Sequence, residues 1–213
     1  MKQTLPEYIA VTRDFYETNA EQYAQNTSDM LDEEWLERFS NMLPDHASVL
    51  DIGCASGRDS AWFSSRGYQV SGIDIAPTFI ELARSKVPSG DFRVMNVTSL
   101  DFEPESFDGV WCSCVLIHLS DEDVLRAINE IWRVLKPGGI LYMLVKAGTK
   151  EGYERDSRYD NMRKYSNYFS EEGLRSMIHD FDVVSFTSVD KPVDNYRAPD
   201  RIFVLAKKAS FVS

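Results

Sequence analysis

Short apolar runs alternate with segments of helical periodicity through the middle of the chain. The runs are rich in branched or aromatic residues and are bounded by turn residues, as strands are. Most intervening segments repeat their apolar residues every three or four positions, which predicts amphipathic helices. Such alternation is typical of βα units that build a parallel sheet. The five strand-like runs are 48–52, 68–73, 92–97, 110–116 and 140–145.

The two ends of the chain depart from this alternation. The N-terminal pattern predicts two helices, over 5–24 and around 30–42. A short helix over 170–179 precedes two strand-like runs, 181–189 and 201–207, with no helix between them. Successive strands without a crossover helix are expected to pair antiparallel. We therefore expect an α/β fold: a mostly parallel seven-stranded sheet with a C-terminal antiparallel pair, helices on both faces and an N-terminal helical cap.

One central helix has clear signals at both ends. Ser120 and Asp123 resemble a capping box at its start. Apolar residues then recur at helical spacing as far as Leu135. The sequence KPGG at 136–139 predicts the end of this helix and a turn into the next strand.

Composition and charge narrow the class of protein. The chain has 213 residues, 43% of them hydrophobic, which suits a single domain. Its formal net charge of -11 disfavours nucleic acid and anionic membranes as partners and suits a small or cationic substrate better. No apolar run approaches the ~20 residues of a membrane span, so we expect a soluble, cytoplasmic protein. Cys54, Cys112 and Cys114 lack metal-ligand spacing, and we expect free thiols and no metal site.

A glycine turn follows the first strand-like run, in the sequence VLDIGCASGRDSAWF. A bare turn between a strand and a helix suits a diphosphate or the amino-acid end of a nucleoside cofactor. Ala55 and Arg58 stand where the dinucleotide fingerprint has its second and third glycines. Asp51, two residues before Gly53, favours an ammonium group over a diphosphate. Asp74 ends the second run, where an acid can accept hydrogen bonds from the ribose diol of either cofactor.

Four segments in order resemble the class I S-adenosylmethionine-dependent methyltransferases, and the resemblance covers nearly the whole chain. They are VLDIGCASGRD, GIDIAP, SFDGVWCSCVLIHL and LKPGGILYM. The resemblance implies a Rossmann-like single domain over 1–213 that uses S-adenosyl-L-methionine. It implies a helical cap over 1–46, a cofactor-binding core over 47–146 and a closing helix and strand pair over 170–213.

The resemblance also implies roles for residues around the glycine turn. Gly53, Ala55 and Gly57 would form the turn that lines the methionine and ribose portion. Asp51 would organise that end of the site. Arg58 would reach the cofactor carboxylate.

Further positions match the other motifs. Asp74 would bind the ribose hydroxyls, with Ile75 against the adenine. Asn96 would meet the adenine amino group beside the Val97 backbone. Cys112 would offer its carbonyl oxygen to the cofactor ammonium.

Three side chains would lie near the transferred methyl group. Tyr16 and Tyr23, seven residues apart in the N-terminal segment, would close over the methionine end. His118 is the candidate general base, because its ordinary pKa lies near neutrality. Each of the three also suits a packing or loop-ordering role, and that alternative stays open.

The segment 147–169 interrupts the βα alternation and is the candidate acceptor lid. It is too polar and aromatic for a sheet strand, and its mixed charges also suit a solvated loop. The acceptor would be a small molecule methylated on oxygen or nitrogen. Two other functions stay open, an NAD(P)-dependent oxidoreductase of similar topology and a non-catalytic protein that binds the cofactor and a partner.

Overall fold

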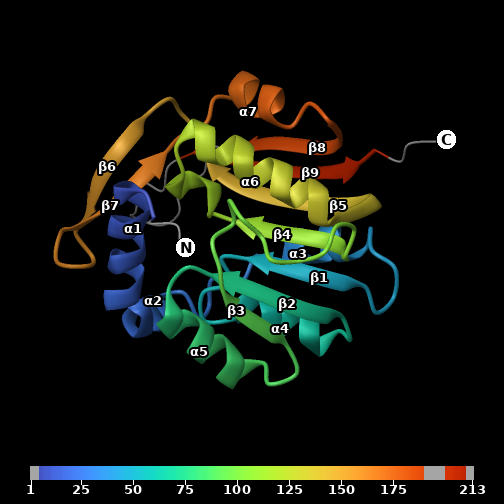
Figure 1. The fold of residues 1–213 in the computed structure, drawn as a ribbon, viewed down its shortest axis with the longest axis horizontal. Coiled ribbons are helices and arrows are strands. Elements are labelled where there is room, and N and C mark those ends of the chain that lie inside the picture. Colours follow the sequence, from blue (N-terminus) through green and yellow to red (C-terminus); the bar gives the residue numbers. More distant parts are fainter. Residues whose placement is uncertain (1–4, 190–199, 210–213) are drawn as a thin grey trace.

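A computed structural model describes residues 5–189 and 200–209, which form one sheet of seven strands flanked by helices (Figure 1). The strand order is β3-β2-β1-β4-β5-β9-β8. Strands β1 to β5 pair in parallel, whereas β9 pairs antiparallel with both β5 and β8. The predicted fold is therefore confirmed. The strands are β1 (Ser48–Ile52), β2 (Gln69–Asp74), β3 (Asp91–Val94), β4 (Phe107–Ser113), β5 (Leu135–Lys146), β8 (Phe181–Val189) and β9 (Arg201–Lys208).

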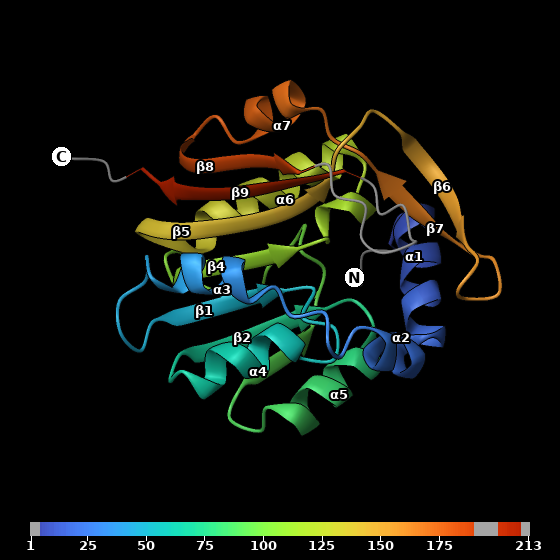
Figure 2. The same cartoon turned by 180° about the vertical axis from the view of Figure 1, so that it is seen from behind.

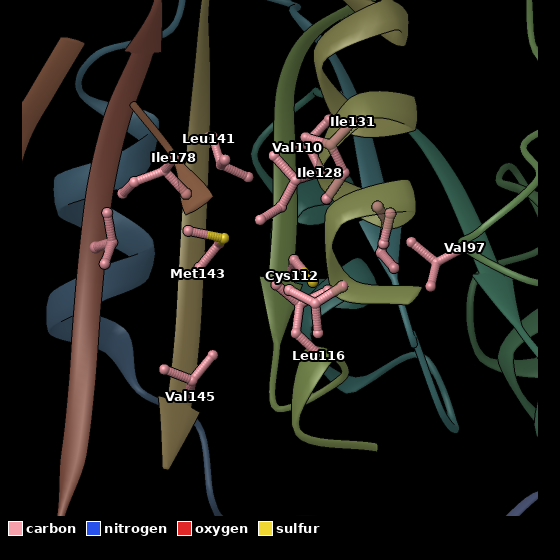
Figure 3. Close-up of a cluster of buried hydrophobic side chains, with 14 of the residues drawn as sticks. Val97, Val110, Cys112, Leu116, Ile128, Ile131, Leu141, Met143, Val145 and Ile178 are labelled. Atoms are coloured by element: carbon pink, nitrogen blue, oxygen red, sulfur yellow. The ribbon is translucent and has the colours of Figure 1, made fainter. Parts of the chain in front are cut away.

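Helices cover both faces of the sheet, so its central strands are apolar on both sides. In β5, Leu141 and Met143 enter the core beneath α6 and α7, whereas Tyr142 enters the core beneath α3 and α4. Figure 3 shows the first core, with Met143 of β5 and Val110 of β4 beside Ile131 of α6. The helices are α3 (Glu33–Ser40), α4 (Arg58–Ser65), α5 (Pro77–Lys86), α6 (Asp121–Val134), α7 (Glu171–Met177) and the 3-10 helix η1 (Leu116–His118).

Helix α6 begins as the sequence predicts, because the Ser120 hydroxyl accepts a hydrogen bond from the Asp123 amide. The prediction for KPGG was wrong in one respect: this segment already belongs to β5. Leu135 pairs with Phe107 immediately after the helix, and the register shifts before Ile140 pairs with Gly109. An irregular strand, rather than a separate turn, follows the helix.

The N-terminal cap is divided differently from the prediction. The expected helix over 5–24 is two helices, α1 (Glu7–Thr18) and α2 (Ala20–Asn26). Between them, the Asn19 side chain donates a hydrogen bond to the Phe15 carbonyl at 2.7 Å. This bond competes with helical continuation, as asparagine side chains commonly do. Among the described helices, none is long and apolar enough to cross a membrane.

The segment 147–169 contains strands, contrary to the prediction. Strands β6 (Glu151–Asp156) and β7 (Met162–Asn167) pair antiparallel in a two-stranded sheet of their own. Asp160 and Asn161 supply the two positive φ angles of the turn, 48° and 54°, which these residue types tolerate well. Figures 1 and 2 both place this hairpin beside α1, beyond the end of the main sheet.

Candidate functional site

A cavity, partly open to solvent, lies at the carboxyl ends of β1, β2 and β4 beneath α1 and α2. The strand order reverses between β1 and β4, and ligands of open α/β sheets bind at such a switch point. Nine of the predicted site residues line the cavity. They are Tyr16, Tyr23, Gly53, Ala55, Asp74, Ile75, Asn96, Val97 and His118.

The glycine turn forms the floor of the cavity. Gly53 has φ of 69°, and a β-carbon there would lie 2.2 Å from the Val115 Cγ2. Ala55 takes φ of 45° although it is not glycine, a conformation that costs most residues free energy. Its methyl group packs in the cluster containing Tyr16, Tyr23 and Phe79. Ala55 therefore connects the cavity floor, by packing, to the aromatic side chains of this cluster.

Asp74 is held at the cavity wall by backbone donors. Its two carboxylate oxygens accept hydrogen bonds from the Ala55 amide at 3.1 Å and the Ala76 amide at 2.9 Å. Burial raises the Asp74 pKa to about 6, although these backbone bonds oppose the shift. Each carboxylate oxygen has further acceptor capacity, so this side chain can also bind a pair of hydroxyl groups.

Four of the predicted residues lie outside the cavity lining: Asp51, Gly57, Arg58 and Cys112. Asp51 accepts a hydrogen bond from the Ser60 hydroxyl at 2.6 Å. Burial, and then the neighbouring carboxylate of Asp59, raise the Asp51 pKa. Arg58 is engaged by the Asp59 carboxylate at 2.7 Å and 3.1 Å. The direct cofactor contacts predicted for these four residues stay predictions.

His118 is hydrogen-bonded through both ring nitrogens. Nδ1 lies 2.7 Å from the Tyr165 carbonyl oxygen of β7, and Nε2 lies 2.7 Å from the Tyr16 hydroxyl of α1. A carbonyl oxygen only accepts, so Nδ1 donates. Burial, reinforced by the charge of Lys164, lowers the His118 pKa to about 3, so the ring is neutral near pH 7. Nε2 therefore accepts the Tyr16 hydroxyl proton.

Part of the cavity lining is apolar. Ile75, Met95, Val97 and Leu119 form this part, together with Asn96. The Asn96 side-chain oxygen accepts a hydrogen bond from the Thr98 amide at 3.1 Å, which fixes the amide plane. Apolar walls with a few oriented polar groups are typical of sites for planar ligands.

Sequence reasoning missed several cavity residues. Phe79 comes from α5, and Ser113 and Cys114 come from the end of β4. The strand-end position of Ser113 and Cys114 is a signal that points to the cavity, because ligands bind beyond the carboxyl ends of parallel strands. Phe79 carries no comparable signal, since its spacing is that of any buried helix residue.

The β6–β7 hairpin contacts α1, which lines the cavity. The Tyr165 amide donates a hydrogen bond to the Thr12 hydroxyl at 3.0 Å. On the inner face of the hairpin, the Lys164 ammonium lies 2.9 Å from Asp156 and 4.5 Å from the Phe15 ring centre. Both charged side chains are about nine-tenths buried. The α1 helix and the hairpin thus form one covering layer.

The geometry agrees with comparisons to known proteins. Residues 50–143 match the family model described as a methyltransferase domain. A solved S-adenosylmethionine-dependent methyltransferase from Methanosarcina mazei superposes with a TM-score of 0.72 at 26% identity, over 80% of this chain and 96% of that one. Over residues 50–143 the chain thus resembles a methyltransferase domain, and its fold is that of the solved S-adenosylmethionine-dependent methyltransferase.

Two further comparisons are with methyltransferases whose names specify a small molecule. A 2-methyl-6-phytyl-1,4-hydroquinone methyltransferase from Synechocystis is 29% identical over 160 residues, covering 73% of this chain and 46% of that protein. A Burkholderia thailandensis 1,6-didemethyltoxoflavin-N1-methyltransferase, solved with 1,6-didemethyltoxoflavin and S-adenosylhomocysteine, has a TM-score of 0.72 at 22% identity over 99% and 94% of the two chains. The latter likeness concerns the fold. The chain spans about half the length of the first curated relatives it matches.

Proposed function

We propose that this protein transfers a methyl group from S-adenosylmethionine to an oxygen or nitrogen of a small molecule. The cavity at the strand switch point carries this proposal, because its lining combines the glycine turn, the Asp74 carboxylate and the apolar residues around Ile75. These groups match the methionine, ribose and adenine portions of the cofactor in that order.

The residues fit the cofactor chemically. Asp74 offers carboxylate oxygens to the ribose diol, and Asn96 stands beside the apolar wall that would hold the base. Asp51 is buried behind the turn. A nearby ammonium group would stabilise its ionised carboxylate, because a positive charge favours the ionised form. The cofactor supplies an activated methyl group, so the protein has mainly to align the acceptor and exclude water.

Tyr16 and His118 are assigned to alignment near the methyl group. His118 is neutral and already accepts the Tyr16 proton, so its free basicity at the cavity is low. Because the Tyr16 hydroxyl donates its proton to His118, the lone pairs of the Tyr16 oxygen point away from the histidine ring. Replacing Tyr16 by Phe should lower kcat while leaving its pH profile unchanged. Loss of a pH-dependent limb in both Tyr16→Phe and His118→Gln would instead support His118 as the general base.

We further propose that the β6–β7 hairpin is the acceptor lid. Its inner face packs on α1 and contacts His118 through the Tyr165 carbonyl. Replacing residues 152–166 by a short glycine linker should lower turnover much more than cofactor affinity. Equal losses in both, or full turnover without the hairpin, would contradict this role.

Three observations favour a small acceptor and a reducing compartment such as the cytoplasm. The net charge of -11 disfavours polyanionic partners. The cavity is covered by α1, which the hairpin contacts. Cys54, Cys112 and Cys114 are free thiols.

Calorimetry with separate cofactors tests the function. S-adenosylmethionine and S-adenosylhomocysteine should bind, whereas NAD and NADP should not. The reverse result would support an oxidoreductase. Binding of S-adenosylmethionine without methyl transfer to any small molecule, but with capture of a protein partner, would support the non-catalytic alternative.

A further inference from the structure

Two cations face each other at the carboxyl end of β5. Lys146, the last residue of β5, pairs directly with Arg201, the first residue of β9, in the antiparallel register. Directly opposite residues project from the same face of a sheet, and like charges there are unfavourable. The preceding pairs on this face, Leu144 with Phe203 and Tyr142 with Leu205, are apolar or aromatic. The chain therefore places two positive charges together where the buried part of the strands ends.

The cation pair adjoins the cavity wall. The Cys114 amide donates a hydrogen bond to the Leu144 carbonyl oxygen, two residues before Lys146, at 2.9 Å, and Cys114 lines the cavity. Burial raises the Cys114 pKa, and the charges of Arg201 and Lys146 are the largest influences that oppose this shift. The charge of Lys146 also acts on His118, on the same cavity. The pair thus lies within electrostatic reach of the reaction space.

The neighbouring acids belong to covering segments rather than to the sheet. Glu154 of β6 lies 3.4 Å from the Lys146 ammonium and also accepts a hydrogen bond from Tyr168. Burial raises the pKa of Asp32, which precedes α3, and the charge of Arg201 is among the influences that oppose this shift. These two acids offset the cations in part. A singly charged anion suits the remaining field better than a dianionic phosphate.

A third donor stands on the same face without an acceptor. The Tyr142 hydroxyl is buried and has no hydrogen-bond partner within 5–189 and 200–209. Burial raises its pKa, and Asp32, Cys114 and Arg201 are among the groups whose charges act on it. Buried donors of this kind usually have a partner, a water or a ligand. Tyr142 thus lies on the same face of the sheet as Lys146 and Arg201, further into the core.

We propose that Lys146 and Arg201 bind a carboxylate of the methyl acceptor, which makes the substrate an anionic small molecule. This inference rests on the proposed methyltransferase function. It accounts for two facing cations in a chain whose net charge is -11. An anionic acceptor is also favoured beside a sulfonium cofactor, because opposite charges attract across a poorly solvated site.

Cys114 provides a reporter inside this region. Its alkylation by iodoacetate, an anion, is compared with alkylation by neutral iodoacetamide, and peptide mass spectrometry distinguishes it from Cys54 and Cys112. The ratio of the two rates cancels any change in thiol pKa. Lys146→Gln and Arg201→Gln should each lower the iodoacetate-to-iodoacetamide ratio by about threefold, as loss of a screened nearby charge predicts.

The control removes an equal charge from the same strand at its far end. Lys207→Gln alters an exposed lysine opposite Ile140, and should leave the ratio unchanged. The proposal would be overturned if the iodoacetate-to-iodoacetamide ratio were equal in the wild-type protein and in all three variants. Failure of both reagents to reach Cys114 in the folded wild-type protein would also overturn it, because an acceptor would then be excluded from the same wall.

Binding of S-adenosylhomocysteine separates this inference from the function on which it rests. Lys146→Gln and Arg201→Gln should keep the wild-type affinity, measured by calorimetry, because the proposed anion belongs to the acceptor. Loss of that affinity in both variants would assign the cations to the cofactor carboxylate and overturn the proposal. Absence of binding in the wild-type protein would instead reject the methyltransferase function.

Discussion

The floor and the cover of the cavity are built in different ways. The floor is made of backbone: the Gly53 and Cys54 amides donate to the Ile73 carbonyl, and the Asp74 carboxylate is held by the Ala55 and Ala76 amides. The cover depends on side chains from distant segments, among them Tyr16 to His118 and Thr12 to Tyr165. Backbone bonds between packed strands resist local opening, whereas a few side-chain contacts release readily. We therefore expect a rigid cofactor site beneath a cover that opens.

The largest expected effect concerns crowding in the floor. Gly53→Ala should lower the free energy of unfolding by about 3 kcal/mol, because the new methyl group meets Val115 in a backbone conformation that alanine rarely adopts. Urea denaturation measures the change. Gly152→Ala in the hairpin is the matched control, since its φ is also positive but nothing lies within 4 Å of its β-carbon. Equal losses in the two variants would show that crowding does not distinguish floor from cover.

Removing the charge of the floor carboxylate should weaken the cofactor. Asp74→Asn should reduce S-adenosylhomocysteine affinity by about 2 kcal/mol, or about thirtyfold, through loss of charge-assisted hydrogen bonds. Calorimetric titration measures this. Asp91→Asn, which changes an exposed aspartate on β3, should leave affinity unchanged. Unaltered affinity in a folded Asp74→Asn protein would mean that Asp74 does not bind the ribose.

Acid should weaken cofactor binding through the same group. The Asp74 pKa is about 6, and the ionised carboxylate is the form that accepts the ribose hydroxyls. As pH falls below 6, binding must first remove a proton, so affinity should drop by about tenfold per pH unit. The Asp74→Asn protein should show a flatter profile between pH 7 and 5. Parallel profiles would assign the pH dependence to another group, such as Asp51.

The smallest expected effect lies in the cover. Lys164→Met removes one partner of the buried Asp156 carboxylate, whose pKa is lowered chiefly by Arg158 and also by Lys164. Because Arg158 remains, the loss of stability should be about 1 kcal/mol, less than for a fully orphaned buried charge. Hydrogen exchange should quicken in β7 and α1 but not in β1 or β2. Arg163→Met, at a half-exposed neighbouring position, should change neither the stability nor the exchange rates. Faster exchange throughout the main sheet in Lys164→Met would contradict a cover that opens independently.

The sequence predicted the sheet and much of the cavity floor because both depend on local patterns. The apolar run before Gly53, the acid at Asp74 and the Ser120 cap each act within a few residues of themselves. The hairpin was not predicted, because Tyr153 and Tyr165 pair across a turn whose Asp160–Asn161 signal lies among polar residues. Its strands are stabilised by packing on α1 rather than by an apolar run of their own.

The sequence by itself determined the succession of strands in the main sheet, the glycine turn and the position of the acid that ends β2. Only the tertiary structure decided what His118 does. Its two partners, Tyr16 and the Tyr165 carbonyl, lie 102 and 47 residues away along the chain. Its burial and its bonding depend on how the N-terminal helix and the hairpin meet over the sheet. The protonation state of a histidine depends on the groups around it in space. No local sequence pattern predicts how the N-terminal helix packs against the hairpin.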